Sequence, residues 1–369
     1  MGRSILQKIK PRSTFDLFSL IYALVLIHAE VLFGEFMVLP WLIKKHNIGL
    51  FKICCLQVYG AFLYFNVIGN MWKIMITNTS TVGKVLPTLL KPGWYYCTIC
   101  ESNSPPRAFH CSTCNKCILK RDHHCMFTGK CIGYFNHRHY LMLVVYTWLG
   151  AMFSIVMSSE FCWEMLGGFS FTNLLKFILP IFAFILGQLD LYTAIVAFLT
   201  LLATIFFALL TGLIIYHSKH VRYGIVTYER SHNIYLFDLG FKNNFRSVFG
   251  DKWYLAMIFP FFHTTLPGDG IEFQTKDTFE RAKDLKILKS NQRIKVVILL
   301  FRETKVCRHY STSEREFPRI CCNLFLPSLE LLTRSLIQDQ IISGSSFTSE
   351  HLYYKTILSG QCYTSDFQR

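Results

Sequence analysis

The stretch CTICESNSPPRAFHCSTCNKCILKRDHHCMFTGKC, residues 97–131, holds seven cysteines and three histidines. Many of the cysteines follow the spacing C-x2-C, which is typical of zinc sites. A zinc ion held entirely by protein side chains takes four ligands, so two zinc ions need eight. Because the stretch offers ten candidate ligands, the sequence predicts two zinc sites and leaves two cysteine or histidine side chains over.

The run DHHC, residues 122–125, indicates which two side chains are left over. In an extended strand, successive side chains point to opposite faces. If this run is extended, His123 and Cys125 share one face, while His124 points to the other and can bind zinc. The predicted zinc ligands are then six cysteines and two histidines: Cys97, Cys100, His110, Cys111, Cys114, Cys117, His124 and Cys131.

The pair of His123 and Cys125 is suited to nucleophilic chemistry. A histidine beside a thiol lowers the pKa of the thiol or takes its proton. Asp122 can bind the other ring nitrogen of His123 and so fix its tautomer, as the third member of a catalytic triad does. The alternative is that Cys125 is a spare thiol and Asp122 a solvated charge.

The rest of the chain has the composition of a membrane protein. Apolar residues make up 52% of its 369 residues and charged residues only 17%. Such a balance is typical of proteins that span a bilayer. Four apolar runs come close to the roughly 20 residues needed to cross hydrocarbon, or exceed them: residues 15–39, 48–76, 140–157 and 191–216.

A fifth apolar run, residues 171–186, is shorter and contains Pro180. We expect it to be an interfacial or re-entrant segment that does not cross the membrane by itself. The first run carries His28, Glu30 and Glu35, which must face a protein interior or the interface. We expect these three side chains to make hydrogen bonds between helices.

The distribution of basic residues predicts the orientation in the membrane. Lys and Arg are frequent at the N-terminus and between the second and third runs, whereas only Lys176 is basic between the third and fourth. The positive-inside rule therefore predicts that the N-terminus, the cysteine-rich stretch and everything after Tyr216 are cytosolic. The net charge of +15 fits loops that lie against anionic lipid. Nucleic-acid binding is disfavoured, because basic nucleic-acid domains are rarely this apolar.

The sequence thus predicts a mainly α membrane protein. Its four-helix transmembrane bundle carries a small cytosolic two-zinc cysteine-rich domain between the second and third spans. We expect five parts along the chain, the last of them a partly disordered tail without motifs. They are the N-terminus with two spans (1–80), the zinc domain (81–139), two spans with an interfacial segment (140–217), a membrane-surface segment (218–268) and the tail (269–369).

The motif from His110 to Asn136, HC-x2-C-x2-C-x4-DHHC-x5-C-x-G-x2-N, resembles the cysteine-rich domain of the DHHC protein S-acyltransferases. The segment VTYE, residues 226–229, is similar to the TTxE motif that follows the last span of that family. The segment DLGFKNNFRSVFG, residues 238–250, is similar to its C-terminal motif, with Asn244 at the asparagine position. The resemblance covers roughly residues 15–268.

The resemblance implies two interleaved structural zinc ions and a two-step reaction. One zinc would be held by Cys97, Cys100, His110 and Cys117, and the other by Cys111, Cys114, His124 and Cys131. Cys125 would attack palmitoyl-CoA, with His123 as base and Asp122 orienting it. A cysteine of a substrate protein would then take the acyl group. The expected activity is that of a protein-cysteine S-palmitoyltransferase.

The resemblance also implies the partners: acyl-CoA, membrane lipid and substrate proteins with cytosolic cysteines near the membrane, but no nucleic acid. The expected location is the endoplasmic reticulum or Golgi membrane. Phosphates of CoA need cations, although a basic run is more often a solvated face on acidic lipid. The candidates are Arg107, Lys116, Lys120, Arg121 and Arg138.

Several positions depart from the family pattern. Met126 and Phe127 replace its Pro-Trp, Gly129 and Lys130 its two asparagines, and Val226 the first Thr of TTxE; Ser104 stands where a basic residue is expected. These departures motivate an alternative function, a catalytically inactive zinc-containing membrane scaffold of the same fold. None of them removes a predicted zinc ligand or member of the triad. A transporter is disfavoured, because it would need ionisable residues deep in the later spans, and only Asp190 qualifies, at the edge of one of them.

Overall fold

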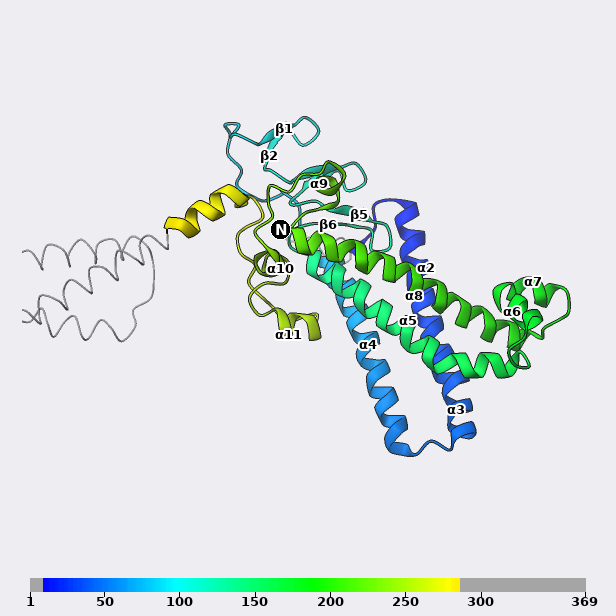
Figure 1. Ribbon diagram of the computed structural model, residues 1–369. Helices are drawn as coiled ribbons and strands as arrows, with labels where there is room; N and C mark the ends of the chain where they lie inside the picture. Colours follow the sequence, from blue (N-terminus) through cyan, green and yellow to red (C-terminus); the bar gives the residue numbers. More distant parts are fainter. Residues whose placement is uncertain (1–8, 286–369) are drawn as a thin grey trace, which may run out of the picture. The chain divides into compact units, whose positions relative to one another are not determined.

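The computed structural model describes residues 9–285, most of which belong to one compact unit, Met1–Arg281. Long helices make up most of this unit, and a small region of short hairpins lies at one end of them (Figure 1). The predicted tail, residues 269–369, falls mostly outside the described residues.

Within residues 9–285, four helical segments are long and apolar enough to cross a membrane, as the sequence predicts. The first runs through α2, a π-helical turn η1 and α3; the others are α4, α5 and α8. The cysteine-rich stretch lies between the second and third of them. Their bounds are Thr14–Phe33 (α2), Gly34–Val38 (η1), Leu39–His46 (α3), Leu50–Ile76 (α4), His137–Met165 (α5) and Leu191–Tyr223 (α8).

Local sequence explains where these helices begin, bend and end. The side chains of Ser13 and Asp190 accept hydrogen bonds from backbone N–H groups in the first turns of α2 and α8. Pro40 lacks an N–H to donate, so the helix widens into η1 just before it. Gly224 ends α8 in the left-handed conformation that glycine adopts without strain.

The polar side chains of the first span bond to neighbouring helices, as predicted. Tyr64 Oη of α4 lies 2.9 Å from His28 Nε2, and Gln57 Nε2 donates to Glu35 Oε2 at 2.6 Å. Ser154 Oγ of α5 donates to Glu30 Oε2 at 2.9 Å. These bonds satisfy polar groups that hydrocarbon would leave unpaired.

Residues 171–186 form two short helices between α5 and α8, namely α6 (Phe171–Ile178) and α7 (Pro180–Ile185). Neither is long enough to cross a bilayer, and α7 begins at Pro180. They lie at the end of α5 and α8 that is far from the hairpins (Figure 1). The prediction that this run does not span is consistent with this arrangement.

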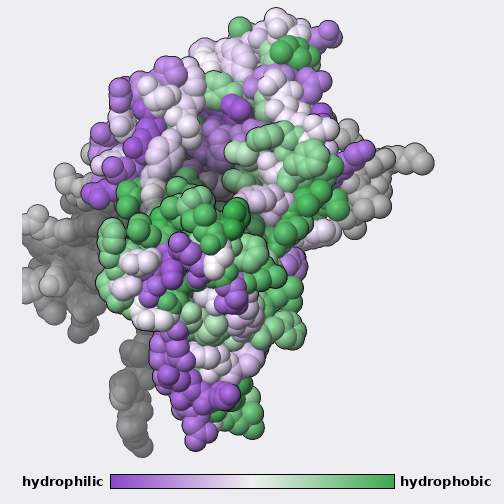
Figure 2. Space-filling view, turned by 90° about the vertical axis from the view of Figure 1, so that its right-hand side faces the viewer, coloured by the Kyte–Doolittle hydropathy of each residue, from purple (hydrophilic) through white to green (hydrophobic). Residues whose placement is uncertain are grey.

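The cysteine-rich stretch folds into three separate antiparallel hairpins, and the described chain after α8 adds three short helices before a last helical stretch at residues 276–285. Seen from the end where α6 and α7 lie, apolar residues gather over the middle of the molecule, with hydrophilic residues above them and at the lower tip (Figure 2). The paired strands are β1 (Tyr95–Cys97) with β2 (Ser102–Ser104), β3 (Phe109–Cys111) with β4 (Lys116–Ile118), and β5 (His123–Cys125) with β6 (Lys130–Ile132). The helices are α9 (Thr227–Ser231), α10 (Phe241–Phe249) and α11 (Trp253–Ile258).

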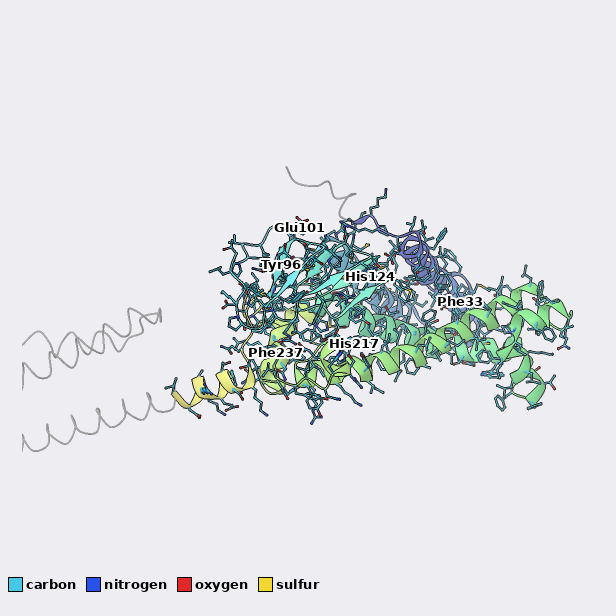
Figure 3. The ribbon with its side chains drawn as sticks, turned by 90° about the horizontal axis from the view of Figure 1, so that it is seen from above. Phe33, Tyr96, Glu101, His124, His217 and Phe237 are labelled. Atoms are coloured by element: carbon cyan, nitrogen blue, oxygen red, sulfur yellow. The ribbon has the colours of Figure 1, made fainter. Side chains whose placement is uncertain are left out.

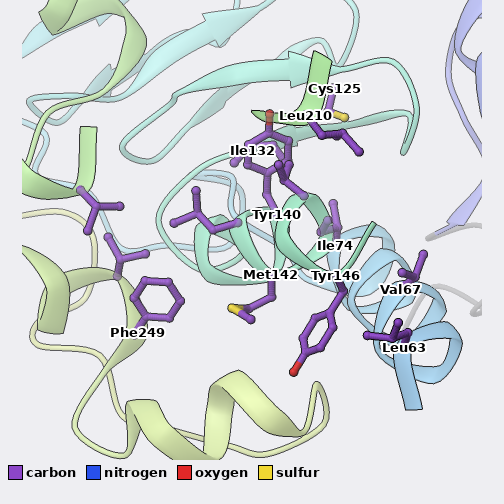
Figure 4. Close-up of a cluster of buried hydrophobic side chains, with 14 residues drawn as sticks. Leu63, Val67, Ile74, Cys125, Ile132, Tyr140, Met142, Tyr146, Leu210 and Phe249 are labelled. Carbon is purple, nitrogen blue, oxygen red and sulfur yellow. The ribbon is translucent and has the colours of Figure 1, made fainter. Parts of the chain in front are cut away.

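The interior is apolar where the hairpins meet the bundle. Helix α5 packs against both α4 and α8. Figure 4 shows the cluster of buried side chains at this junction, which includes Cys125 of the hairpins beside Ile74, Tyr140 and Leu210 of the helices. The hairpin that carries Cys125 is therefore built onto the ends of the membrane helices.

Candidate active site and zinc centres

The first group of metal-ligand side chains joins hairpin β1–β2 to hairpin β3–β4. It consists of Cys97, Cys100, His110 and Cys117. His110 and Cys117 are register partners across β3 and β4, so their side chains share one face. His110 Nδ1 lies 3.7 Å from the Sγ of Cys97 and 3.3 Å from that of Cys100.

The second group joins hairpin β3–β4 to hairpin β5–β6. It consists of Cys111, Cys114, His124 and Cys131. His124 and Cys131 are register partners, and His124 Nδ1 lies 3.4 Å from Cys114 Sγ and 3.5 Å from Cys131 Sγ. The two groups therefore alternate along the chain and link the three hairpins in series.

Both groups fit a zinc ion. Each offers three thiols and one imidazole, a ligand set of structural zinc sites. Zn–S bonds of about 2.3 Å and Zn–N bonds of about 2.0 Å place tetrahedral ligands roughly 3.6 Å apart, which matches the sulfur–nitrogen distances above. A bound zinc would cross-link hairpins that are too short to hold together by strand pairing alone.

Asp16 supports the second group from the membrane side. This buried residue of α2 lies with its Oδ2 3.1 Å from His124 Nε2. A histidine that binds metal through one nitrogen commonly donates its other N–H to a carboxylate, which fixes the ring. Figure 3 shows His124 beside the N-terminal helix that carries Asp16. No sequence pattern predicts this contact, because Asp16 resembles an ordinary acidic residue in a first helical turn.

Residues His123–Cys125 form strand β5, so their side chains alternate in the way the sequence suggested. His124 faces the second zinc group, and His123 and Cys125 face the bundle. His123 contacts the ring of Tyr140 edge-on, with centroids 4.7 Å apart. Cys125 is buried in the apolar cluster (Figure 4).

Asp122 links His123 to the segment that follows α8. Its Oδ2 lies 2.8 Å from His123 Nδ1. Its Oδ1 accepts hydrogen bonds from Thr227 N at 2.9 Å and Thr227 Oγ1 at 3.1 Å. Thr227 is the second position of the VTYE segment, so that segment reaches the candidate site. The Nε2 of His123 is the nitrogen left for the Cys125 thiol.

The electrostatics favour a charged pair of His123 and Cys125. Burial alone would lower the pKa of His123, but its hydrogen bonds to Asp122 and Cys125 raise that pKa to about 9. Burial alone would raise the pKa of the Cys125 thiol, yet the neighbouring His123 lowers it below its ordinary value. For Asp122, burial would raise the pKa, but the hydrogen bond from His123 and the nearby ring of His220 hold it well below the usual range. Together these three pKa shifts favour an imidazolium on His123 beside a thiolate on Cys125.

The fourth position of the VTYE segment, Glu229, forms a buried ion pair with Arg107. Arg107 Nε and Nη2 donate to the two carboxylate oxygens of Glu229 at 2.6 and 2.8 Å. Arg107 Nη2 also donates to Gly224 O, and its guanidinium lies over the ring of Phe237. The pair ties the hairpins to the end of α8. Val226, where the family pattern has Thr, is fully buried.

The five basic residues predicted to contact CoA do not form one exposed group. Arg107, Lys120 and Arg138 are buried, and Arg138 Nη2 donates to Phe262 O. Burial also lowers the pKa of Lys120, to about 7. Lys116 and Arg121 are partly exposed. The burial of three candidates could not be predicted from a run of Lys and Arg, which more often lies in solvent.

Asn244 lies where the C-terminal motif folds back onto α8. It is buried, and its Nδ2 donates to Arg222 O at 2.8 Å and to Asp238 Oδ1 at 2.7 Å. Its Oδ1 accepts from Leu239 N at 3.0 Å. One side chain thus satisfies the backbone at the end of α8 and the loop before α10. This accounts physically for an asparagine at this position.

Comparison with known proteins agrees with this geometry. Residues 91–234 match the DHHC palmitoyltransferase family. Curated relatives include the probable palmitoyltransferase ZDHHC24 of Danio rerio, which is 33% identical over 224 residues, or 60% of this chain and 76% of that protein. The proteins of the same name from Rattus norvegicus and Homo sapiens are each 33% identical, over 58% of this chain and 77% of their own length. The chain therefore belongs to the DHHC palmitoyltransferase family.

Proposed function

We propose that the protein is a protein-cysteine S-palmitoyltransferase that carries the acyl group on Cys125. Membership of the family supports palmitoyltransferase activity. The observation that carries the finer proposal is the placement of β5. His123 and Cys125 share the face that meets the bundle, and Asp122 holds Nδ1 of His123 at 2.8 Å. Such a nucleophile, base and orienting group is the usual arrangement for acyl transfer.

In the first step, the Cys125 thiolate attacks the carbonyl carbon of a long-chain acyl-CoA. A new carbon–sulfur bond forms to Cys125, and the bond to the CoA sulfur breaks. His123, which holds the proton that came from Cys125, gives it to the departing CoA thiolate. Asp122 keeps the ring oriented and stabilises its positive charge.

In the second step, the thiol of a substrate protein attacks the acyl-enzyme. His123, now neutral, takes the proton of that thiol. The acyl group moves to the substrate cysteine, and the Cys125 thiolate leaves. This exchange restores the starting ion pair, so each group returns to its original protonation state.

The position of Cys125 suits a donor that stays partly in the membrane. Its thiol is surrounded by residues at the ends of α4, α5 and α8. An acyl chain beside these helices keeps its CH2 groups in hydrocarbon, which is worth about 0.8 kcal/mol each. For the CoA phosphates we propose contacts with Lys116 and Arg121, the two predicted cations that are partly exposed. Substrate cysteines close to the membrane would reach Cys125 most easily.

The remaining expectations from the sequence complete the proposal. Two zinc ions, when bound by the two groups described above, would supply structural cross-links and no chemistry. We propose that the zinc domain comprises residues 81–139 and that it and both termini are cytosolic. The endoplasmic reticulum and Golgi membranes are the proposed locations. Positive charge near the second and third spans supports the orientation.

Labelling with an alkyne analogue of palmitoyl-CoA tests the proposal. Purified wild-type protein should acquire a label that hydroxylamine removes, as expected for a thioester. Cys125→Ser should lose the label and retain its zinc. Cys54→Ser, which alters an exposed thiol on α4, should label like wild type. Cys114→Ser should lose zinc and protein yield, because structural zinc contributes folding free energy.

The alternative function, an inactive scaffold, predicts a different result in the same experiment. Wild-type protein would then contain both zinc ions and bind partners but acquire no label. Label that persists in Cys125→Ser would also overturn the proposal, because the acyl group would then sit on another thiol.

A further inference from the structure

The carboxylate of Asp122 has a second pair of histidine neighbours, His217 and His220. The two histidines lie one turn apart near the end of α8, so both can point toward Asp122. One ligand atom from each of the three side chains lies within 4.8 Å of the other two. All three residues are buried, and the side chains of Asp122 and His220 have no exposed surface. Figure 3 shows His217 on this part of α8.

Three nitrogens of this cluster have no hydrogen-bond partner among residues 9–285. They are Nδ1 of His217 and both ring nitrogens of His220. Buried polar atoms are almost always paired with protein, water or an ion. Two histidines that share a small buried space with a carboxylate therefore point to a missing ligand.

The spacing fits a metal ion better than a direct hydrogen bond. His220 Nδ1 lies 3.6 Å from Asp122 Oδ1, which is too long for a hydrogen bond. Tetrahedral zinc with bonds of about 2.0–2.2 Å holds such ligands roughly 3.3–3.6 Å apart.

The groups around the cluster resemble those that orient metal ligands. His217 Nε2 lies 3.1 Å from Tyr140 Oη, which leaves its Nδ1 available to a cation. The carboxylate of Asp122 is held by Thr227 and His123. Metal-binding histidines and carboxylates are usually fixed by hydrogen bonds of this kind.

We propose that Asp122, His217 and His220 form a third divalent-cation site, of the zinc class, whose occupation inhibits acyl transfer. Two imidazoles and a carboxylate with an open fourth position are a common zinc environment. The inhibitory effect rests on the proposed function, because it acts through Asp122. A cation bound to this carboxylate competes with the hydrogen bonds that orient His123. The two structural zinc groups share no side chain with this site.

The test counts zinc by mass spectrometry after equilibrium dialysis of the full chain against buffered free Zn2+. Wild type should bind one zinc ion more than its two structural groups account for. His220→Leu and His220→Gln should lose that ion alone, and retention of the structural zinc shows that they are folded. His232→Leu is the matched control, because it removes an exposed histidine that follows α9. Cys125→Ser should bind the additional ion, since its thiol is not among the proposed ligands.

The kinetic measurement uses the same zinc series. Acyl-enzyme formation by wild type should fall as the site fills, by up to about 10⁴-fold, the loss typical when the carboxylate that orients a catalytic histidine is replaced, and should recover with a chelator. The rate of acyl-enzyme formation by His220→Leu, whatever its starting value, should not change over the same range of zinc concentrations. The site would be overturned if wild type bound no additional zinc ion or if both His220 variants bound as many zinc ions as wild type. Loss of the additional ion in Cys125→Ser would also overturn it. If wild type forms no acyl-enzyme, the proposed function fails, and the zinc count still decides the site.

Discussion

At the scale of single residues, the pairing of His123 with Cys125 determines the pH at which the Cys125 thiol is ionised. An ordinary thiol has a pKa near 8.5 and is mostly protonated at neutral pH. Burial raises the pKa of Cys125 further, and the neighbouring His123 more than reverses this. The thiolate therefore persists below the pH at which a free thiol becomes protonated, and it is lost as the pH falls through the lowered pKa.

His123→Ala should move this titration upward. Without His123, burial is the main influence on the Cys125 thiol. Its pKa should therefore rise above that of a free thiol. Alkylation of Cys125 by iodoacetamide, followed by mass spectrometry across pH, gives the midpoint. Acyl-enzyme formation by this variant should be slow at neutral pH, by about 10²–10⁴-fold at most, and should increase with pH. Equal midpoints in wild type and variant would show that His123 does not activate the thiol.

Strand alternation and the count of zinc ligands were sufficient to predict which side chains the structure brings into the two candidate zinc groups. The eight side chains singled out from the sequence lie in two groups of four. The contacts of Asp16 and Arg107 could not be predicted, because Asp16 and His124 are 108 residues apart and Arg107 and Glu229 are 122 apart. Spacing along a chain carries no information about such distant partners.

At the scale of elements, helix α2 joins the membrane bundle to the second zinc group through Asp16. The side chain of Ser13 accepts from Asp16 N at 3.0 Å, which fixes the first turn of the helix. The Asp16 carboxylate then holds His124 from the side opposite the cysteines. Movement of α2 is thus coupled directly to a zinc ligand.

Asp16→Ala should weaken zinc binding at the second group without emptying the first. Loss of an outer partner commonly reduces metal affinity 10- to 100-fold. Zinc release to a chromogenic chelator should therefore show one accelerated phase. Asp190→Ala is a suitable control, because Asp190 is an aspartate at the start of another membrane helix, α8, but lies outside both zinc groups. Identical release curves for the two variants would contradict the role of Asp16.

Hydropathy predicted which segments are helices better than where they end. The third span was expected over residues 140–157, whereas α5 runs from His137 to Met165. A hydropathy pattern reports the part of a helix that lies in hydrocarbon. Backbone hydrogen bonds continue past it into polar residues such as Ser158 and Glu160, so the helix is longer than its apolar run.

At the scale of the whole molecule, two membrane segments separate the hairpins from the VTYE segment. These are α5 and α8, while α6 and α7 are too short to span. An even number of crossings returns the chain to the side on which it started. Asp122 contacts Thr227, and Arg107 contacts Glu229. Both pairs join residues before α5 to residues after α8, so they require the start of α5 and the end of α8 to be on the same side.

Glycosylation mapping should place both regions in the cytosol. Tyr235→Thr creates the acceptor Asn233-Ile-Thr on the exposed loop after α9, and this acceptor should remain unmodified. The natural acceptor Asn78-Thr-Ser should also remain free of glycan. A short acceptor-bearing insertion at Gly187, on the opposite side, should be modified. Glycan at Asn233 would show that the predicted orientation is wrong.

The class of fold could be predicted from four apolar runs and one metal-binding motif, but the packing of the bundle could not. Helix α5 lies between α4 and α8 because of matched surfaces on three helices. In a membrane, such matching depends on shape and on a few polar contacts. Trp148 Nε1 donating to Thr211 Oγ1 at 2.8 Å is one of them, and neither residue stands out in a hydropathy profile.

The hydrogen bond between Glu30 and Ser154 also has a consequence for how the chain is made. The two residues are 124 positions apart, so the first helix emerges from the ribosome long before its partner exists. At about 5–20 residues per second, the delay is roughly 6–25 s. Throughout this interval the insertion machinery must shelter an acidic side chain whose burial in lipid costs about 2.5–3.5 kcal/mol. The first helix therefore depends on late synthesis of the third, and a pause in translation between them prolongs the period in which the nascent chain is exposed to quality control.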